Sequence, residues 1–288
     1  MDLGFKNAGF ETIWANEFDK KIASYFEKNF SIPVDKRSIV KISNEEIPFA
    51  DGIIGGPPCQ SWSEAGSRKG IDDSRGKLFY EYIRVLDYIQ PKFFVAENVS
   101  GLLHSRNQQA FHNIMNILSQ NYCVNYKLVN AKNYETPQDR ERVIIVGYHK
   151  SLNKSFEFPL PIKPIPTLKD ALENVPESDY YDGSYSSIYM SRNRVRSWDE
   201  QSFTILASQR HIPIHPSSPK MKKIGVDQYE FVEKCRRLSV RECGRIQTFP
   251  DWYCFPDDIG TAYKMIGNAV PVKLAENIAK RIKEDLDV

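Results

Sequence analysis

The chain has 288 residues, and its 41% hydrophobic content is enough to bury the core of one large domain, or of a large domain plus a small one. No apolar run approaches the roughly 18 residues of a membrane span and no charged-then-apolar leader precedes the fold, so we expect a cytoplasmic protein. Five scattered cysteines argue against a disulfide framework or a metal site. Because the net charge is only +2, affinity for nucleic acid would require cations gathered on one face.

Strand-like and helix-like segments alternate through the first half of the chain, which predicts an α/β fold built on a mostly parallel sheet. Asp19 is expected to cap the first of the longer helices, because its carboxylate can accept from free amide groups there. The expected strands are 12–16, 52–54, 93–96, 124–129 and 143–148, and the expected helices are 19–30, 77–89, 108–119 and 272–286.

The second half is different in character. Four prolines between residues 159 and 166 predict a linker into a second unit. Residues 165–250 show weak periodicity and many polar side chains, which suits a DNA-reading surface better than a core. Basic residues gather in this unit: Arg192, Arg194, Arg196, Arg210, His211, Lys220, Lys222 and Lys223.

Residues 55–63, Gly-Gly-Pro-Pro-Cys-Gln-Ser-Trp-Ser, follow a short apolar strand. Each proline fixes φ near −65° and the glycines permit close approaches, so Cys59 sits on a stiff turn. A lone cysteine is more often a small buried packing residue. Stiffening of this kind favours instead a nucleophile that must meet one atom from one direction.

Further segments complete a pattern with this turn: Phe-Phe-Val-Ala-Glu-Asn-Val at 93–99, Gln-Asp-Arg-Glu-Arg at 138–142, the arginine-rich block 236–250, and 263–272 ahead of the last helix. In this order they resemble the DNA cytosine methyltransferases that methylate carbon 5. The resemblance covers nearly the whole chain. Residues 61–64, 70–73, 77–82 and 189–196 are similar to the bacterial modification enzymes that protect GGCC, the HaeIII methyltransferase group.

The resemblance implies a Rossmann-like, S-adenosylmethionine-dependent catalytic domain and a smaller, irregular DNA-recognition domain. The catalytic domain would comprise residues 1–160 and 260–288, because the last helix packs back onto it. The recognition domain would comprise residues 161–259.

The same resemblance assigns the chemistry. Cys59 would add to carbon 6 of cytosine and make carbon 5 nucleophilic. Glu97 would hydrogen-bond to ring nitrogen 3 and the exocyclic amine, which requires a protonated carboxyl. Arg140 would contact the base and stabilise the adduct, whereas Arg142 would support Arg140 or pair with an acid. Asn98 would orient the neighbouring backbone.

S-adenosylmethionine is the implied methyl donor. Glu17, at a strand end, matches the acid that binds ribose hydroxyls. Trp14 fits a core position better than a donor contact. Ser38 occupies the position of the family's adenine-reading acid, with Asp35 nearby as a substitute. The remaining positions that match residues near the donor are Asn268 and Val270.

The family opens with a strand and a Phe-x-Gly-x-Gly-Gly loop beside the donor, and Met1 to Phe5 correspond to the helix after that loop. We expect about a dozen upstream residues to encode the loop, since it directly precedes the first helix of such a unit. The missing strand would belong between 12–16 and 52–54. Residues 1–288 alone are therefore expected to bind the donor weakly and to be unstable.

Carbon 6 is unreachable in a stacked duplex, so the chemistry implies base flipping. Arginine pairs bidentately with guanine, and the candidates for sequence reading are Arg192, Arg194, Arg196 and Arg210. Phosphate contact without readout is an equally good interpretation for any one of them. The expected partners are double-stranded DNA and a cognate restriction endonuclease, with the enzyme itself a monomer. The alternatives are an RNA cytosine-5 methyltransferase, whose variable region is typically shorter, and an N-terminally truncated, non-catalytic DNA-binding relative.

Overall fold

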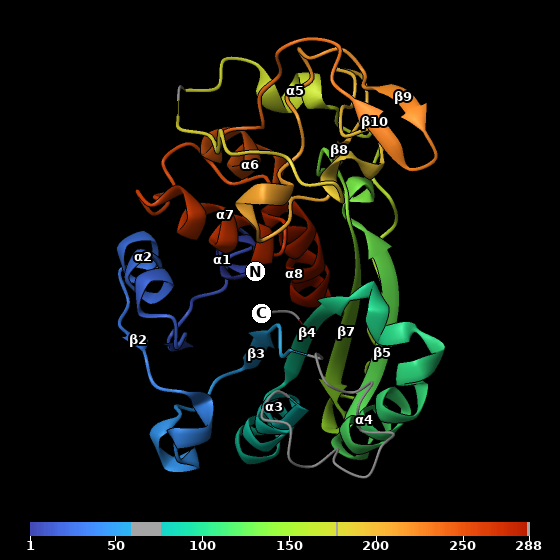
Figure 1. Cartoon of the computed structure of the whole chain (residues 1–288). Helices are drawn as coiled ribbons and strands as arrows, with labels where there is room; N and C mark the ends of the chain where they lie inside the picture. Colours follow the sequence, from blue (N-terminus) through green and yellow to red (C-terminus); the bar gives the residue numbers. More distant parts are fainter. Residues whose placement is uncertain (59–75, 177, 287–288) are drawn as a thin grey trace.

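The computed structural model describes residues 1–58, 76–176 and 178–286 (Figure 1). Its central sheet has the strand order β3-β4-β7-β5. β3 (Gly52–Gly55) and β4 (Phe93–Val99) are parallel, and β7 (Glu141–His149) is antiparallel to both β4 and β5 (Tyr122–Asn130). Three of the four strands therefore run in one direction, in line with the expected α/β class. The short connection from β5 to β7 contains no crossover helix, and such a connection joins antiparallel neighbours.

A second, smaller sheet stands apart from this one. β1 (Ala15–Asn16) pairs in parallel with β2 (Val34–Asp35), and neither strand is hydrogen-bonded to the central sheet. β1 is shorter than the predicted strand 12–16. Within the described residues, β1 and β3 each pair with a neighbour strand on one side only. A strand between 12–16 and 52–54 stays a prediction.

Successive residues of β4 point to opposite faces of the central sheet, and both faces are apolar. Phe94 and Ala96 pack against α3 (Gly76–Ile89) and α4 (Gln108–Asn121). Phe93 and Val95 pack on the other face, in one cluster with Phe5 of α1 (Asp2–Asn7) and Ile278 of α8 (Val272–Leu286). The last helix therefore packs back on the first part of the chain, as expected, and Figure 1 shows it beside the sheet.

The predicted helix limits agree closely with the structure, because local signals set them. α2 (Lys20–Phe30) begins after Asp19, whose carboxylate accepts from the amides of Lys21 at 3.1 Å and Ile22 at 3.3 Å. α8 spans Val272–Leu286, as the amphipathic pattern predicted.

Short elements, nearly all from the second half of the chain, lie at one end of the molecule (Figure 1). They include two strand pairs, the parallel β6–β8 and the antiparallel β9–β10. The strands are β6 (Gln138–Asp139), β8 (Ser202–Phe203), β9 (Lys222–Gly225) and β10 (Gln228–Glu230), and the helices are α5 (Leu168–Leu172), α6 (Val240–Ile246) and α7 (Ile259–Asn268). The connections contain 3₁₀ turns η1 (Ile39–Lys41), η2 (Asn44–Glu46), η3 (Ser100–Leu103), η4 (Ser105–Asn107), η5 (Ala131–Asn133), η6 (Lys150–Leu152), η7 (Tyr189–Ser191) and η8 (Gln209–His211).

Two apolar clusters organise this half. The larger one joins α5, α6 and α7 to Leu3 of α1, so it contains residues from both sides of the predicted domain limit at 259/260. The smaller one holds Tyr189, Val195, Ile214 and Met221, all from the predicted recognition unit. The division into 1–160 with 260–288 and 161–259 stays a prediction. Among the helices of the described residues, none is long and apolar enough to cross a membrane.

Candidate active site

One cavity of about 1800 Å³ runs along the facing edges of β1 and β3 and continues past the ends of β3 and β4. Carboxyl ends of parallel strands gather at one side of a sheet, which is where α/β folds bind ligands. The structure brings together here the predicted catalytic and donor residues that lie in the described ranges. They are Glu17, Ser38, Glu97, Arg140, Arg142, Asn268 and Val270.

The turn that precedes the predicted nucleophile forms part of this wall. Cys59 itself lies outside the described residues, whereas Pro57 and Pro58 line the cavity. The side-chain amide of Asn98 donates to the carbonyl of Pro57 at 2.8 Å, and its oxygen accepts from the amide of Val99 at 3.0 Å. Asn98 thus ties the end of β4 to the turn after β3, and the prediction that it orients neighbouring backbone is confirmed.

Glu97 and Arg142 form an ion pair at the end of β4. The Nε of Arg142 lies 2.8 Å from Oε1 of Glu97, and their side chains are only 13% and 12% exposed. Burial lowers the pKa of Arg142, and the nearby Glu97 carboxylate opposes that shift. A Cβ atom added to Gly56 would lie 3.4 Å from Oε2 of Glu97, so the turn at Gly55 and Gly56 runs close to this carboxylate. The pair presents a carboxyl group and a guanidinium to the same part of the cavity.

Arg140 is held differently, although it stands only two residues away. Its side chain is buried, and it donates to the carbonyls of Ile205 at 3.0 Å, Gly267 at 2.9 Å and Ala269 at 3.1 Å. Burial, reinforced by the charge of Arg142, lowers the pKa of Arg140 to about 9, which still leaves it charged at neutral pH. The guanidinium of Arg140 therefore connects the residue before β7 to two segments distant in sequence, one at Ile205 and one at Gly267 to Ala269.

The donor-side candidates lie at the other end of the cavity. Burial raises the pKa of Glu17, and the amide of Asp19, which donates to Oε1 at 2.8 Å, opposes this shift. The carboxylate of Asp35 forms an ion pair with Arg37, whose Nη2 lies 2.6 Å from Oδ2 of Asp35. Trp14 is partly buried: it packs against the cluster of Ile42, Ile47, Val85 and Ile89 and also lines the cavity, so its assignment to the core stays a prediction.

Phe18 is a cavity residue that the sequence reasoning missed. It follows Glu17 directly, lines the cavity and is 73% exposed. An aromatic residue between a strand-end acid and the Asp19 cap has no helix face to pack on. That position in the sequence is the signal that could have identified it.

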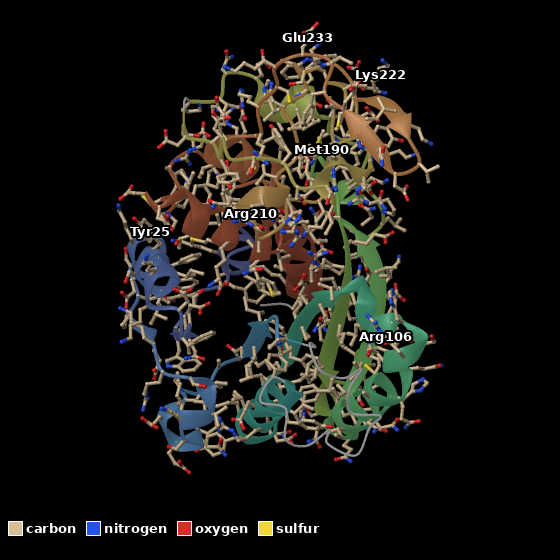
Figure 2. All side chains as sticks on the ribbon, in the orientation of Figure 1. Tyr25, Arg106, Met190, Arg210, Lys222 and Glu233 are labelled. Carbon is tan, nitrogen blue, oxygen red and sulfur yellow. The ribbon has the colours of Figure 1, made fainter. Side chains whose placement is uncertain are left out.

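The predicted DNA-reading arginines fall into two groups. Arg192 and Arg210 are exposed, and the structure gives neither guanidinium a hydrogen bond or ion pair among the described residues. The Nε of Arg194 donates to the carbonyl of Tyr189 at 2.7 Å, and its Nη2 donates to the carbonyl of Ile188 at 2.9 Å. Figure 2 places Arg210 near the middle of the molecule.

Arg196 belongs with Arg194. Its guanidinium lies 4.2 Å from the centre of the Phe203 ring and pairs with Glu200 at 3.0 Å. Both guanidinium groups thus already have partners within the protein, in contrast to those of Arg192 and Arg210. Across the described part of the chain, no group of three or more histidine, cysteine, aspartate or glutamate side chains is placed to hold a metal ion.

Comparison with known proteins agrees with this arrangement. The family of C-5 cytosine-specific DNA methylases matches residues 1–284. The chain is 51% identical to the type II methyltransferase M.FnuDI of Fusobacterium nucleatum, over 99% of this chain and 92% of that protein. It is 46% identical to M.NgoPII of Neisseria gonorrhoeae, over 100% of this chain and 93% of that protein.

Solved structures share the fold. The methyltransferase EhMeth of Entamoeba histolytica superposes with a TM-score of 0.76 at 19% identity, covering 98% of this chain and 95% of that one. The Dnmt2 methyltransferase of S. pombe superposes with a TM-score of 0.74 at 16% identity, covering 100% and 96%.

The fold is that of the S-adenosylmethionine-dependent methyltransferases, and the chain is an enzyme of that class. More narrowly, it belongs to the family of C-5 cytosine-specific DNA methylases.

Proposed function

We propose that this chain is the modification enzyme of a type II restriction–modification system and methylates carbon 5 of cytosine within GGCC in duplex DNA. The relatives named type II methyltransferases support the system and imply a cognate restriction endonuclease. The motif segments at 61–64, 70–73, 77–82 and 189–196 support the site. The observation that carries the proposal is the Glu97–Arg142 pair beside the Pro57–Pro58 turn, in one cavity with Glu17.

In this proposal Cys59 is the nucleophile. Its thiolate adds to carbon 6, the carbon 5–carbon 6 double bond is lost, and carbon 5 gains the electron pair that bonds to the methyl group. A base then removes the carbon-5 proton, and those electrons restore the double bond as the thiolate leaves. The bonds that Asn98 makes hold the turn before Cys59, so the sulfur would approach the ring from a fixed direction.

Glu97 and Arg142 would hold the cytosine. As a carboxylate paired with Arg142, Glu97 can accept from the exocyclic amine, and a bond to ring nitrogen 3 requires that the carboxyl group first gain a proton. The Arg142 guanidinium can orient Glu97 and donate to a base oxygen at the same time, because a guanidinium has five N–H donors. Arg140 belongs to the same site as a positioning residue, since its bonds to Gly267 and Ala269 hold a segment that lines the same cavity as Arg142.

S-adenosylmethionine, when bound, supplies an electrophilic methyl group. The cavity fits such a donor chemically. The Glu17 carboxylate can accept from ribose hydroxyls, and the exposed Phe18 ring can stack on a planar base. Ser38, Asn268 and Val270 complete the polar and apolar lining on the remaining sides.

Sequence reading would fall first to Arg192 and Arg210, because their guanidinium groups are exposed and unoccupied within the described residues. Each could pair with oxygen 6 and nitrogen 7 of a guanine. The target cytosine must leave the helix to reach the Glu97–Arg142 pair, so base flipping is part of the proposal.

The test is transfer of labelled methyl groups to a GGCC duplex, with a duplex changed at one base pair and an RNA of the same sequence as controls. A duplex carrying 5-fluorocytosine should trap a covalent complex, because loss of the carbon-5 substituent is then blocked. Cys59→Ser should bind DNA but form no complex. Methylation of the RNA alone would overturn the proposed function, and so would the absence of methylation of any substrate by folded protein at a donor concentration that saturates a weak site.

A further inference from the structure

Arg237 is one of the largest fully buried side chains of the described residues, with 1% exposure. No carboxylate pairs with it within those residues. Its Nη1 donates to the carbonyls of Tyr181 at 3.2 Å and Gly183 at 2.8 Å, and its Nη2 donates to the carbonyl of Ser184 at 3.2 Å. A buried cation is costly unless such dipoles and its other neighbours stabilise it.

Those other neighbours are tyrosine rings. The Cζ of Arg237 lies 4.0 Å from the ring centre of Tyr185, 4.9 Å from that of Tyr181 and 5.3 Å from that of Tyr189. Cation–π attraction is strongest where both groups are shielded from water. One guanidinium therefore holds three aromatic side chains and three carbonyls of the segment 181–189.

Tyr189 carries this arrangement on to the predicted reading segment. The guanidinium of Arg194 lies 4.7 Å from the ring centre of Tyr189, so this ring contacts two arginines. The Nε of Arg194 donates to the carbonyl of Tyr189, and the Tyr189 hydroxyl donates to the carbonyl of Ile212 at 2.7 Å. Arg192 lies between Tyr189 and Arg194 in the sequence. A displacement of Tyr189 would move the backbone that presents Arg192.

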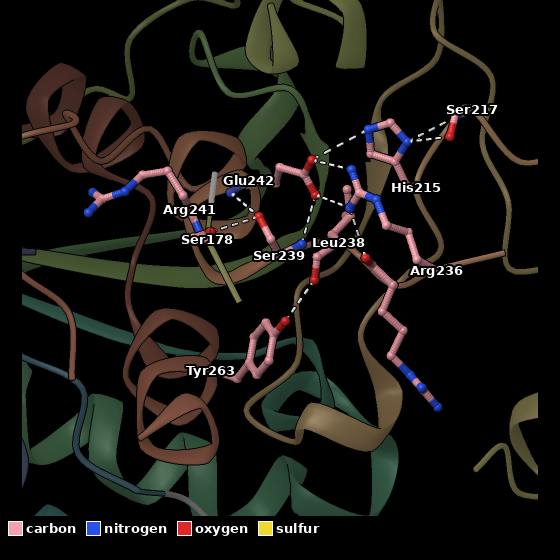
Figure 3. A network of polar contacts seen from close by, with 10 residues as sticks. Ser178, His215, Ser217, Arg236, Leu238, Ser239, Arg241, Glu242 and Tyr263 are labelled. Atoms are coloured by element: carbon pink, nitrogen blue, oxygen red, sulfur yellow. Dashed lines mark hydrogen bonds and ion pairs between the residues drawn. The ribbon is translucent and has the colours of Figure 1, made fainter. Parts of the chain in front are cut away.

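The backbone on the other side of Arg237 is firmly held (Figure 3). Arg236 binds both oxygens of Glu242, at 2.8 and 2.7 Å, and the amide of Ser239 donates to the same carboxylate at 2.7 Å. The amide of Leu238 donates to the carbonyl of Pro213 at 2.9 Å. The backbone that carries Arg237 is therefore tied to Glu242 and Pro213, while the Arg237 side chain extends to the segment 181–189.

We propose that Arg237 is a positioning residue that fixes segment 184–196 through Tyr185 and Tyr189, and that it thereby sets how sharply the enzyme discriminates between DNA sites. It takes no part in methyl transfer. The inference rests on the proposed role of this segment in reading DNA.

The test compares Arg237→Met with Arg241→Met. Arg241 is a matched control, because it also donates to a carbonyl, that of Tyr253 at 3.0 Å, and lies 5.3 Å from a ring centre, that of Phe255. Plasmid DNA is methylated by each variant and sequenced after bisulfite treatment, which reports every modified cytosine without assuming the site. Values of kcat and KM are then measured on the preferred duplex and on duplexes with one base pair changed.

Arg237→Met should lower the ratio of kcat/KM between the preferred and the changed duplex about tenfold, the scale of losing two or three shielded cation–π contacts. The loss should appear in KM, with kcat at saturating DNA within about twofold of wild type, and Arg241→Met should leave the ratio unchanged. An unchanged ratio in a folded Arg237→Met protein would overturn the inference.

Tyr185 provides a second route if Arg237→Met does not fold. Tyr185→Phe keeps a ring under the guanidinium and should keep the discrimination, whereas Tyr185→Leu should reduce it. Equal discrimination by these two variants would contradict the role of the stack. Absence of any methylation by folded wild type at saturating donor would instead contradict the proposed function, so the two failures are distinguishable.

Discussion

Replacing Arg140 with methionine tests whether this arginine holds the walls of the site together or acts on the base. The substitution removes hydrogen bonds to the carbonyls of Ile205, Gly267 and Ala269. The carbonyl of Ala269 keeps a second donor, the side-chain amide of Gln247 at 3.2 Å. The other two carbonyls lose the only donor that the structure gives them among the described residues.

An unsatisfied buried carbonyl costs about 1–3 kcal/mol, and part of this is offset because a cation no longer has to be desolvated. We therefore expect the free energy of unfolding to fall by about 3 kcal/mol. A chain of 288 residues has an unfolding entropy of roughly 0.6 kcal/mol/K, so the melting temperature should fall by about 5 °C.

Differential scanning fluorimetry, with methylation measured on the same samples, checks this expectation. Arg281→Met is the control, because Arg281 is half-exposed and its i,i+4 partner Asp285 keeps the hydroxyl of Tyr148 as a donor, so the melting temperature should change little. If Arg140→Met melts with the wild type but loses all methylation, Arg140 acts on the base and the positioning role is wrong.

Three further outcomes are expected. Gly267→Ala should cost about 1–3 kcal/mol in a thermal melt, because its new Cβ would lie 2.3 to 2.5 Å from backbone atoms of Leu206 and Ala207. Arg192→Ala should relax preference at one base pair by about 1–3 kcal/mol in competition assays on variant duplexes. His215→Gln should make the melting temperature less sensitive to pH at and below about pH 6.5. Burial lowers the pKa of His215 although Glu242 opposes it, so the unfolded chain binds more protons and stability falls as the pH drops through about 6.5.

Each of these has its own check. Gly101→Ala is the matched control for Gly267, since its nearest contact would be an ordinary 3.9 Å, and equal melting of both variants would contradict the clash. Uniform weakening on all duplexes would mark Arg192 as a phosphate contact. If His215→Gln leaves the dependence of melting temperature on pH unchanged, other groups, for example Glu242, control the loss of stability at low pH. Burial raises the pKa of Glu242, but bonds from Arg236 and the Ser239 amide outweigh this and keep it low.

Local signals in the sequence predicted helix positions well. The Asp19 cap and the apolar stripe of α8 depend on neighbours within a few residues, and both were confirmed. β1 was predicted too long, because strand pairing depends on a partner far along the chain. The position of β7 between β4 and β5 likewise follows from tertiary pairing, although the absence of a helix between two strands indicates antiparallel neighbours.

The site shows the same distinction. Motif order placed Glu97 and Arg142 in one cavity with Glu17, but it could not show that Arg140 is held by three carbonyls. Those acceptors belong to Ile205, Gly267 and Ala269, which lie more than sixty residues away in sequence. The engagement of Arg194 with Tyr189 is also tertiary, and composition alone counts every arginine as equally available.

The separation of the β1–β2 pair from the central sheet has a consequence for the energetics of ligand binding. The β1–β2 pair and the central sheet share no hydrogen-bond ladder, so each can open without the other. The amides of Val34 and Asp35 should therefore exchange with solvent through openings of lower free energy than those of β4. A molecule that touches Glu17, next to β1, and Glu97, in β4, would bind only when both sheets are in place. Donor binding should then make the two sheets unfold as one cooperative unit, with the small sheet gaining most of the protection.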